Sequence, residues 1–177
     1  LKHFATEEQR RKFFPLIAQG KISAFALTEK EAGSDPSRMQ SRVALSEDGE
    51  FYILSGEKWY CTNGMIADNI LVMAKTAPYG PKDITAFILT MDTPGITKEL
   101  RKFSGYRGLE NATLKFDNVR IPKENVIGEW GKGLPRDTSR NLSGGVKNDS
   151  SDSIALASSG AGGSALATRG QKLNAAE

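Results

Sequence analysis

Two short segments of this 177-residue chain carry side chains that could hold a flat, hydrogen-bonding ligand. In the first, residues 25–35, an apolar run ends in Thr28, and Gly33 and Ser34 follow it. A glycine lets a ligand approach the backbone closely, and hydroxyls suit a heterocycle with carbonyl groups or a phosphate edge. The alternative interpretation is purely structural, with Asp35 capping a short helix that begins at the proline after it.

The second segment, residues 56–64, places two large aromatic residues before small polar ones. The ring of Tyr60 could lie against a flat ring system, and the hydroxyl of Thr62 could donate to a ring nitrogen. The alternative is an ordinary strand with Trp59 and Tyr60 on opposite faces, closed by the Asn-Gly turn that begins at Asn63.

Strands must position both segments, because from residue 21 onward the apolar pattern is that of β structure. Alternation is clearest near the end of this region, where Ala112, Leu114 and Phe116 share one face. The expected strands cover residues 22–27, 43–45, 51–54, 57–61, 69–75, 84–91 and 111–121. Because no helical pattern separates them, we expect a mainly β fold, a small antiparallel barrel or sandwich.

A short helix should precede the strands, over about residues 7–19. Thr6 and Gln9 have the spacing of a capping box, in which each side chain binds the other residue's backbone amide. Pro15 should kink or split this helix, and Gly20 is well placed to end it.

Residues 135–177 differ from the rest of the chain in composition. They contain eight Ser, seven Ala and six Gly, and all fourteen aromatic residues of the chain lie at or before Trp130. Such a composition buries too little apolar surface to offset chain entropy, so we expect this tail to be disordered.

Charge and cysteine content exclude some classes of function. A net charge of +3 with interspersed signs disfavours nucleic-acid binding. The single cysteine, Cys61, can form neither an internal disulfide nor a zinc site by itself, which fits a reducing compartment. We expect no membrane span and an intracellular location.

Taken together, the motifs of residues 1–134 resemble the end of the first helical domain and the whole middle β domain of an acyl-CoA dehydrogenase. Besides the two segments above, the resemblance rests on further stretches in the right order, namely residues 1–10, 93–95, 105–108, 116–122 and 125–128. It implies three parts: 1–20 from the helical domain, 21–134 as the middle domain, and 135–177 as the tail.

The resemblance implies that FAD is the cofactor and that an acyl-CoA is oxidised to the 2-enoyl-CoA. In such enzymes Leu27 and Thr28 would lie near the pyrimidine edge of the flavin. Tyr60, where Trp is commonest, would stack on the ring, and Thr62 would donate toward N5. The implied FAD contacts are Phe25, Ala26, Leu27, Thr28, Gly33, Ser34, Tyr60, Cys61 and Thr62, and the implied acyl-CoA contacts are Ser34 and Thr76.

Partners and location also follow from the resemblance: the electron-transferring flavoprotein, homo-oligomers of the full-length enzyme, and the bacterial cytoplasm or mitochondrial matrix. The resemblance ends at Leu134, before the helical domain that carries the family's catalytic base. Glu29 and Glu31 are expected to be surface carboxylates without an acid–base role. We therefore expect an enzyme fragment that is inactive alone. The alternatives are a non-catalytic β-domain binding module and a related flavin oxidase or monooxygenase.

One spatial expectation underlies this interpretation. The strand that ends at Thr28 and the one that ends at Thr62 should converge, and Tyr60 should lie outside the hydrophobic interior.

Overall fold

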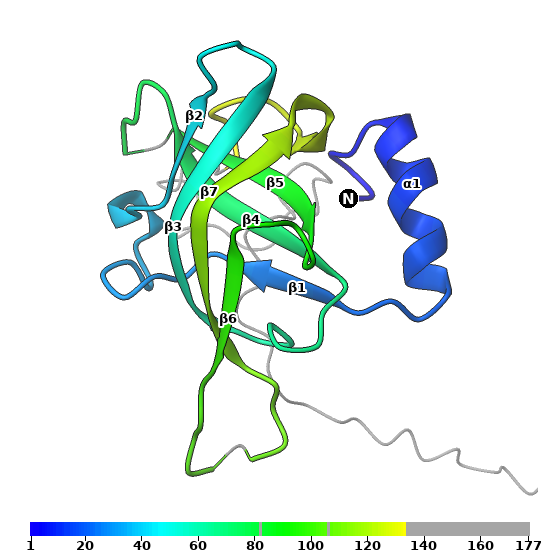
Figure 1. Ribbon diagram of the computed structural model, residues 1–177, viewed down its shortest axis with the longest axis vertical. Coiled ribbons are helices and arrows are strands. Elements are labelled where there is room, and N and C mark those ends of the chain that lie inside the picture. Colours follow the sequence, from blue (N-terminus) through cyan, green and yellow to red (C-terminus); the bar gives the residue numbers. More distant parts are fainter. Residues whose placement is uncertain (82, 106, 134–177) are drawn as a thin grey trace, which may run out of the picture. The chain divides into compact units, whose positions relative to one another are not determined.

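The computed structural model describes residues 1–81, 83–105 and 107–133, so the tail expected at 135–177 lies outside the described residues. The described chain is mainly β, with one α-helix followed by an eight-stranded sheet, which confirms the expected fold class (Figure 1). The division of the chain into three parts stays a prediction.

Helix α1 spans Glu7–Ala18 and begins with the expected capping box. The amide of Gln9 donates to Thr6 Oγ1 at 3.2 Å, and the amide of Thr6 donates to Gln9 Oε1 at 2.9 Å. Pro15 lies inside the helix but does not split it. The chain leaves the helix at Gly20, whose φ of 85° is accessible to glycine at little cost. In the described residues no helix is long and apolar enough to cross a membrane.

The strands form one open, mixed sheet in the order β6-β7-β3-β2-β4-β5-β8, with β1 paired to β4. The elements are β1 (Ser23–Ala26), η1 (Pro36–Arg38), β2 (Arg42–Leu45), β3 (Phe51–Cys61), β4 (Asn69–Thr76), β5 (Ile84–Thr90), β6 (Ile96–Leu100), β7 (Ala112–Pro122), η2 (Lys123–Asn125) and β8 (Val126–Ile127). The hairpin expected around the Asp-Gly turn is present, because β2 and β3 pair antiparallel.

Several elements differ from expectation. The strands expected at 51–54 and 57–61 are one continuous strand, β3, and strands β6 and β8 were not expected. Two pairings, β1 with β4 and β2 with β4, are parallel, which an antiparallel barrel does not include. Parallel partners cannot be joined by a tight turn, so local turn signals do not reveal them.

The core lies on both sides of the sheet. Six of the seven residues of β5 are buried, so this strand is covered on both faces, and its near-continuous apolar run reflects that. One cluster, around Leu54, Phe87 and Leu114, fills one side. A second cluster, around Met39 and Ile84, includes Phe13 of α1 and so attaches the helix to the sheet.

Candidate functional site

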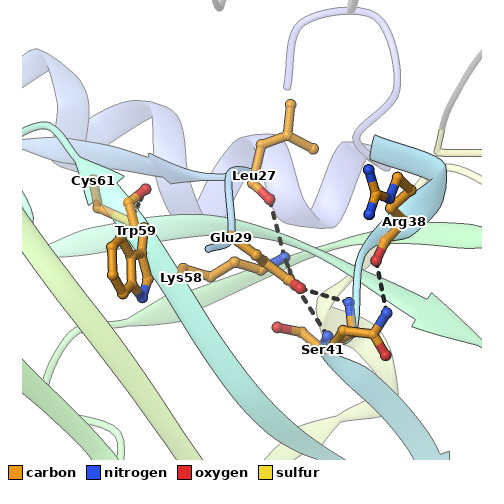
Figure 2. Close-up of polar contacts among 8 residues, drawn as sticks. Leu27, Glu29, Arg38, Ser41, Lys58, Trp59 and Cys61 are labelled. Atoms are coloured by element: carbon orange, nitrogen blue, oxygen red, sulfur yellow. Dashed lines mark hydrogen bonds and ion pairs between the residues drawn. The ribbon is translucent and has the colours of Figure 1, made fainter. Parts of the chain in front are cut away.

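The ends of the two sequence segments lie side by side in the structure. The backbone amide of Trp59 donates to the carbonyl of Thr28 at 2.8 Å. Next to this bond, Lys58 Nζ donates to the carbonyl of Leu27 at 3.2 Å (Figure 2). The end of β1 and the end of β3 therefore converge, as the sequence predicted, even though about thirty residues separate them along the chain.

A buried ion pair joins the two segments. Lys58 Nζ lies 2.7 Å from Glu29 Oε1, and the two residues are 0% and 6% exposed. Glu29 also accepts the backbone amides of Gln40 at 2.5 Å and Ser41 at 3.0 Å (Figure 2). The expectation that Glu29 is a surface carboxylate is wrong, because Lys58 and these amides replace the water that a buried carboxylate loses. Glu31 is exposed, as expected.

The surroundings of this pair set its protonation. Burial lowers the pKa of Lys58 to about 8, although the neighbouring carboxylate opposes this shift. Burial also acts to raise the pKa of Glu29, but the Lys58 ammonium and the bonds from Ser41 and Gln40 outweigh it and hold that pKa below its usual value. Glu29 is therefore ionised and paired with Lys58. This is a structural role and not that of a general base.

Tyr60 lies outside the core. It is 48% exposed and has a positive φ of 58°, at an irregularity where the pairing of β3 with β7 shifts register between Lys58 and Cys61. The guanidinium of Arg101 lies 4.2 Å from the ring centroid of Trp59 and 4.6 Å from that of Tyr60. Both rings contact one guanidinium, so the alternative with the two rings on opposite faces does not hold.

The residues after Tyr60 have contrasting exposure. Cys61 is 1% exposed, and burial raises the pKa of its thiol to about 12, so it is an inert core residue whose backbone alone could reach a ligand. Thr62 is exposed, and its Oγ1 accepts from Asn111 Nδ2 at 3.5 Å. The chain then turns at Asn63, with a φ of 62°, as the Asn-Gly signal indicated. Thr62 can therefore donate to a ligand from the surface.

In the first segment the side chains nearest the core are least available. Ala26 is fully buried, whereas Gly33 and Ser34 are exposed; Phe25, Leu27 and Thr28 are intermediate. Asp35 caps helix η1 by accepting the amide of Ser37 at 3.0 Å, so the structural alternative for that residue is also confirmed. A capping role for Asp35 leaves the neighbouring glycine and serine free to contact a ligand.

Gly33 has no packing reason to be glycine. A Cβ atom built at this position would meet no atom within 4 Å, and its φ is not in the left-handed region. Gly56 is the opposite case, because its φ is 146° and an added Cβ would lie 2.4 Å from Ser41 Oγ. The fold therefore requires glycine at 56, while at 33 the empty space is available to a ligand.

Thr76 lies at the end of β4 and is fully buried. Its hydroxyl is 2.9 Å from Thr85 Oγ1 and 3.3 Å from the carbonyl of Asp83. These contacts tie β4 to β5 and give Thr76 a structural role. Its assignment to acyl-CoA stays a prediction.

Sequence reasoning missed Lys58, Arg101 and Asn111. A signal for Lys58 was available, because the period-2 alternation that puts Leu54 inside also puts Lys58 inside. A buried lysine requires a partner of opposite charge. Arg101 and Asn111 gave no such signal, because no local pattern shows that they contact the second segment at Trp59, Tyr60 and Thr62.

Comparisons with known proteins place this geometry in context. The family model described as "Acyl-CoA dehydrogenase, middle domain" matches residues 24–119. The chain is 48% identical over 137 residues to "Probable acyl-CoA dehydrogenase FadE10" of Mycobacterium tuberculosis, covering 76% of this chain and 21% of that protein. The chain thus spans about a fifth of the length of that curated relative.

Solved structures agree with the family match. The structure of butyryl-CoA dehydrogenase from Megasphaera elsdenii is similar, with a TM-score of 0.69 and 42% identity, over 73% of this chain and 34% of that chain. An acyl-CoA dehydrogenase of Bacillus anthracis, solved in complex with FAD, gives a TM-score of 0.68 and 37% identity, over 72% of this chain and 22% of that chain.

Proposed function

Because the chain belongs to the acyl-CoA dehydrogenase family, we propose that it is the flavin-facing middle part of an enzyme that oxidises an acyl-CoA thioester to the 2-enoyl-CoA. The observation that carries the proposal is the convergence of the two segments through the Trp59–Thr28 hydrogen bond, with Tyr60 and Thr62 left exposed beside it. When bound, FAD would supply the oxidising power by accepting a hydride.

The residues present fit an isoalloxazine ring. Such a ring needs an aromatic face to lie against, hydrogen-bond donors along its polar edge and an unobstructed approach to the backbone. Tyr60 offers the face and Thr62 a hydroxyl donor, while the open space above Gly33 leaves the approach free. The nine FAD contacts named from the sequence are kept as proposals, with Ala26 and Cys61 limited to backbone contacts by their burial.

The remaining parts of the reaction would come from the full-length enzyme. Glu29 is held by Lys58 and two backbone amides, so the proposal assigns the catalytic base to the rest of that enzyme. Acyl-CoA as the substrate, the electron-transferring flavoprotein as acceptor, homo-oligomerisation and an intracellular location complete the proposal by family membership.

FAD binding by the chain tests the cofactor assignment. Titration of FAD followed by flavin fluorescence should show quenching, since stacking on Tyr60 quenches the flavin. Gly33→Ala should leave the unfolding midpoint unchanged and weaken FAD binding by about tenfold, a change of about 1.4 kcal/mol. Gly108→Ala is the matched control, because its Cβ would also meet nothing within 4 Å but it lies outside the two segments. Equal affinities for all three proteins would contradict the assignment.

The reaction itself needs a catalytic base, which the proposal assigns to the rest of the full-length enzyme. Joining the helical domain of a relative after residue 134 and adding an acyl-CoA without oxygen should bleach the flavin absorbance, more slowly with Thr62→Ala. Rapid oxygen consumption would favour a flavin oxidase or monooxygenase. Binding of acyl-CoA without any bound flavin would favour a non-catalytic module.

A further inference from the structure

Arg101, the residue after strand β6, contacts the two aromatic residues at the end of β3. Its guanidinium carbon lies 4.2 Å from the centroid of Trp59 and 4.6 Å from that of Tyr60. The two rings meet edge to face, with centroids 5.9 Å apart. A planar cation attracts the faces of aromatic rings, and arginine does so more readily than lysine. These contacts link strand β6 to the segment proposed to face the cofactor.

Other bonds fix Arg101 independently of the rings. Its backbone amide donates to the carbonyl of Asn111 at 2.9 Å, and its Nη1 donates to Thr113 Oγ1 at 2.9 Å. Thr113 lies in β7 and is only 3% exposed, so the acceptor is a buried residue of a paired strand. The guanidinium is therefore anchored to strand β7, next to the edge strand β6, and can act as a support for the rings.

Tyr60 needs such a support. Its φ of 58° lies in the left-handed region, which is costly for a residue with a Cβ atom, and its half-exposed side chain has little core packing to hold it there. Non-glycine residues keep such conformations only where the surrounding contacts impose them. In the described residues, the ring of Tyr60 has the guanidinium of Arg101 over it, and the rings of Trp59 and Phe103 lie 5.9 Å and 6.1 Å away between centroids.

We propose that Arg101 is a positioning residue that holds the Tyr60 ring at the surface offered to FAD. The inference rests on the proposed function for its cofactor part, but the order of the rings can be measured without any cofactor. A planar guanidinium anchored at Thr113 keeps Tyr60 in its left-handed conformation, so that FAD binding does not have to order the ring first.

Experiments on the chain without FAD test whether Arg101 holds the two rings in place. In a Trp130→Phe background Trp59 is the remaining tryptophan of the two, so its fluorescence reports on this cluster alone. Arg101→Gln should raise the acrylamide quenching constant of Trp59 about twofold to threefold and weaken the near-ultraviolet circular dichroism of the aromatic residues. Lys123→Gln, which removes an exposed cation of η2 away from these rings, should change neither signal. Unchanged signals in Arg101→Gln would overturn the inference.

Measurements of FAD affinity test whether this positioning of the Tyr60 ring favours cofactor binding. Arg101→Gln should weaken FAD binding about tenfold, or about 1.4 kcal/mol. Arg101→Lys should weaken it nearly as much, because lysine keeps the charge but lacks the planar fork. Full affinity in Arg101→Lys, or in Arg101→Gln despite disordered rings, would overturn the positioning role. Should Arg101→Gln fail to fold, Thr113→Val removes only the anchor and should shift both readouts in the same direction, and unchanged readouts in that variant would overturn the inference.

The two proposals fail differently. Absence of FAD binding by the parent chain and every variant would overturn the proposed cofactor site and the cofactor part of this inference. The quenching and dichroism signals of the apo chain would still decide whether Arg101 holds the rings.

Discussion

Replacing Lys58 by methionine should destabilise the chain far more than loss of a surface ion pair would. The substitution keeps an unbranched side chain, shorter by the terminal nitrogen, but leaves the Glu29 carboxylate, which is 6% exposed, without its cation. Removing one partner of a buried pair costs about 3–5 kcal/mol, because the remaining charge is neither hydrated nor compensated. The assay is urea unfolding followed by tryptophan fluorescence and far-ultraviolet circular dichroism, with the free energy of unfolding extrapolated to water.

Two further variants isolate the cause. Lys58→Met combined with Glu29→Gln removes the uncompensated charge, so it should recover about 2 kcal/mol or more of the loss. Lys21→Met breaks the pair with Asp68, whose N–O distance is a similar 2.8 Å but whose side chains are 50% and 35% exposed. Its loss should be a small fraction of that of Lys58→Met, because water screens and replaces an exposed pair.

The contribution of Glu29 to stability should depend on pH in opposite directions in the parent and in Lys58→Met. In the parent, Lys58 and the backbone amides hold the pKa of Glu29 below its reference value of 4.5, so the stability from this carboxylate is present above pH 4.5 and lost as the pH falls through its folded value. In Lys58→Met, burial acts without the cation and should raise that pKa, so the variant should gain stability as the pH falls. The difference between parent and variant should thus shrink from pH 7 to pH 4. A loss below about 1 kcal/mol that does not vary with pH would refute this reasoning.

Three further changes test other parts of the structure. Burial raises the pKa of Cys61 from 9.0 to about 12, so the stability that this thiol contributes should be lost as the pH rises above 9. At pH 8, iodoacetamide should alkylate the native chain about 100-fold more slowly than the urea-unfolded chain. Comparable alkylation rates would contradict the burial of Cys61. Gly56→Ala should cost about 3 kcal/mol in urea unfolding, because an added Cβ would lie 2.4 Å from Ser41 Oγ at a φ of 146°, and an unchanged midpoint would be inconsistent with this close approach. Gln9→Ala removes the side-chain hydrogen bonds to the carbonyls of Glu124 at 2.6 Å and Val126 at 2.7 Å, as well as half of the capping box. It should lower the free energy of unfolding by about 2 kcal/mol. The control Glu8→Ala, at an exposed residue, should leave that free energy nearly unchanged.

How much of the fold was predictable depended on how local its cause was. The capping box at Thr6, the helix end at Gly20 and the alternation of β7 depend on residues a few positions apart, and the structure confirms them. Strands β6 and β8 were missed because their sequences alternate weakly: β6 is largely exposed and β8 has two residues. Their strand conformation comes from pairing with β7 and β5, which no local pattern encodes.

The candidate site divides in the same way. The residue types of the two segments indicated a flat, hydrogen-bonding ligand, and the order of the motifs indicated the family, which the match of the middle-domain model supports. That the carboxylate of Glu29 is buried, however, follows from Lys58 and the amides of Gln40 and Ser41, which the fold brings to it. A carboxylate with no visible partner in the sequence is predicted to be exposed, because charged side chains are almost always hydrated unless they are paired.

The sequence by itself determined where helix α1 begins and ends, which residues face the core in most strands, and which family the motifs resemble. Only the tertiary structure decided that Lys58 is the buried counter-ion of Glu29, that the backbone of Tyr60 is left-handed, and that Arg101 contacts its ring. The physical reason is the distance along the chain between the residues that interact. Backbone propensity and capping act between neighbours, whereas desolvation and charge pairing depend on which distant residues the fold brings within a few ångströms.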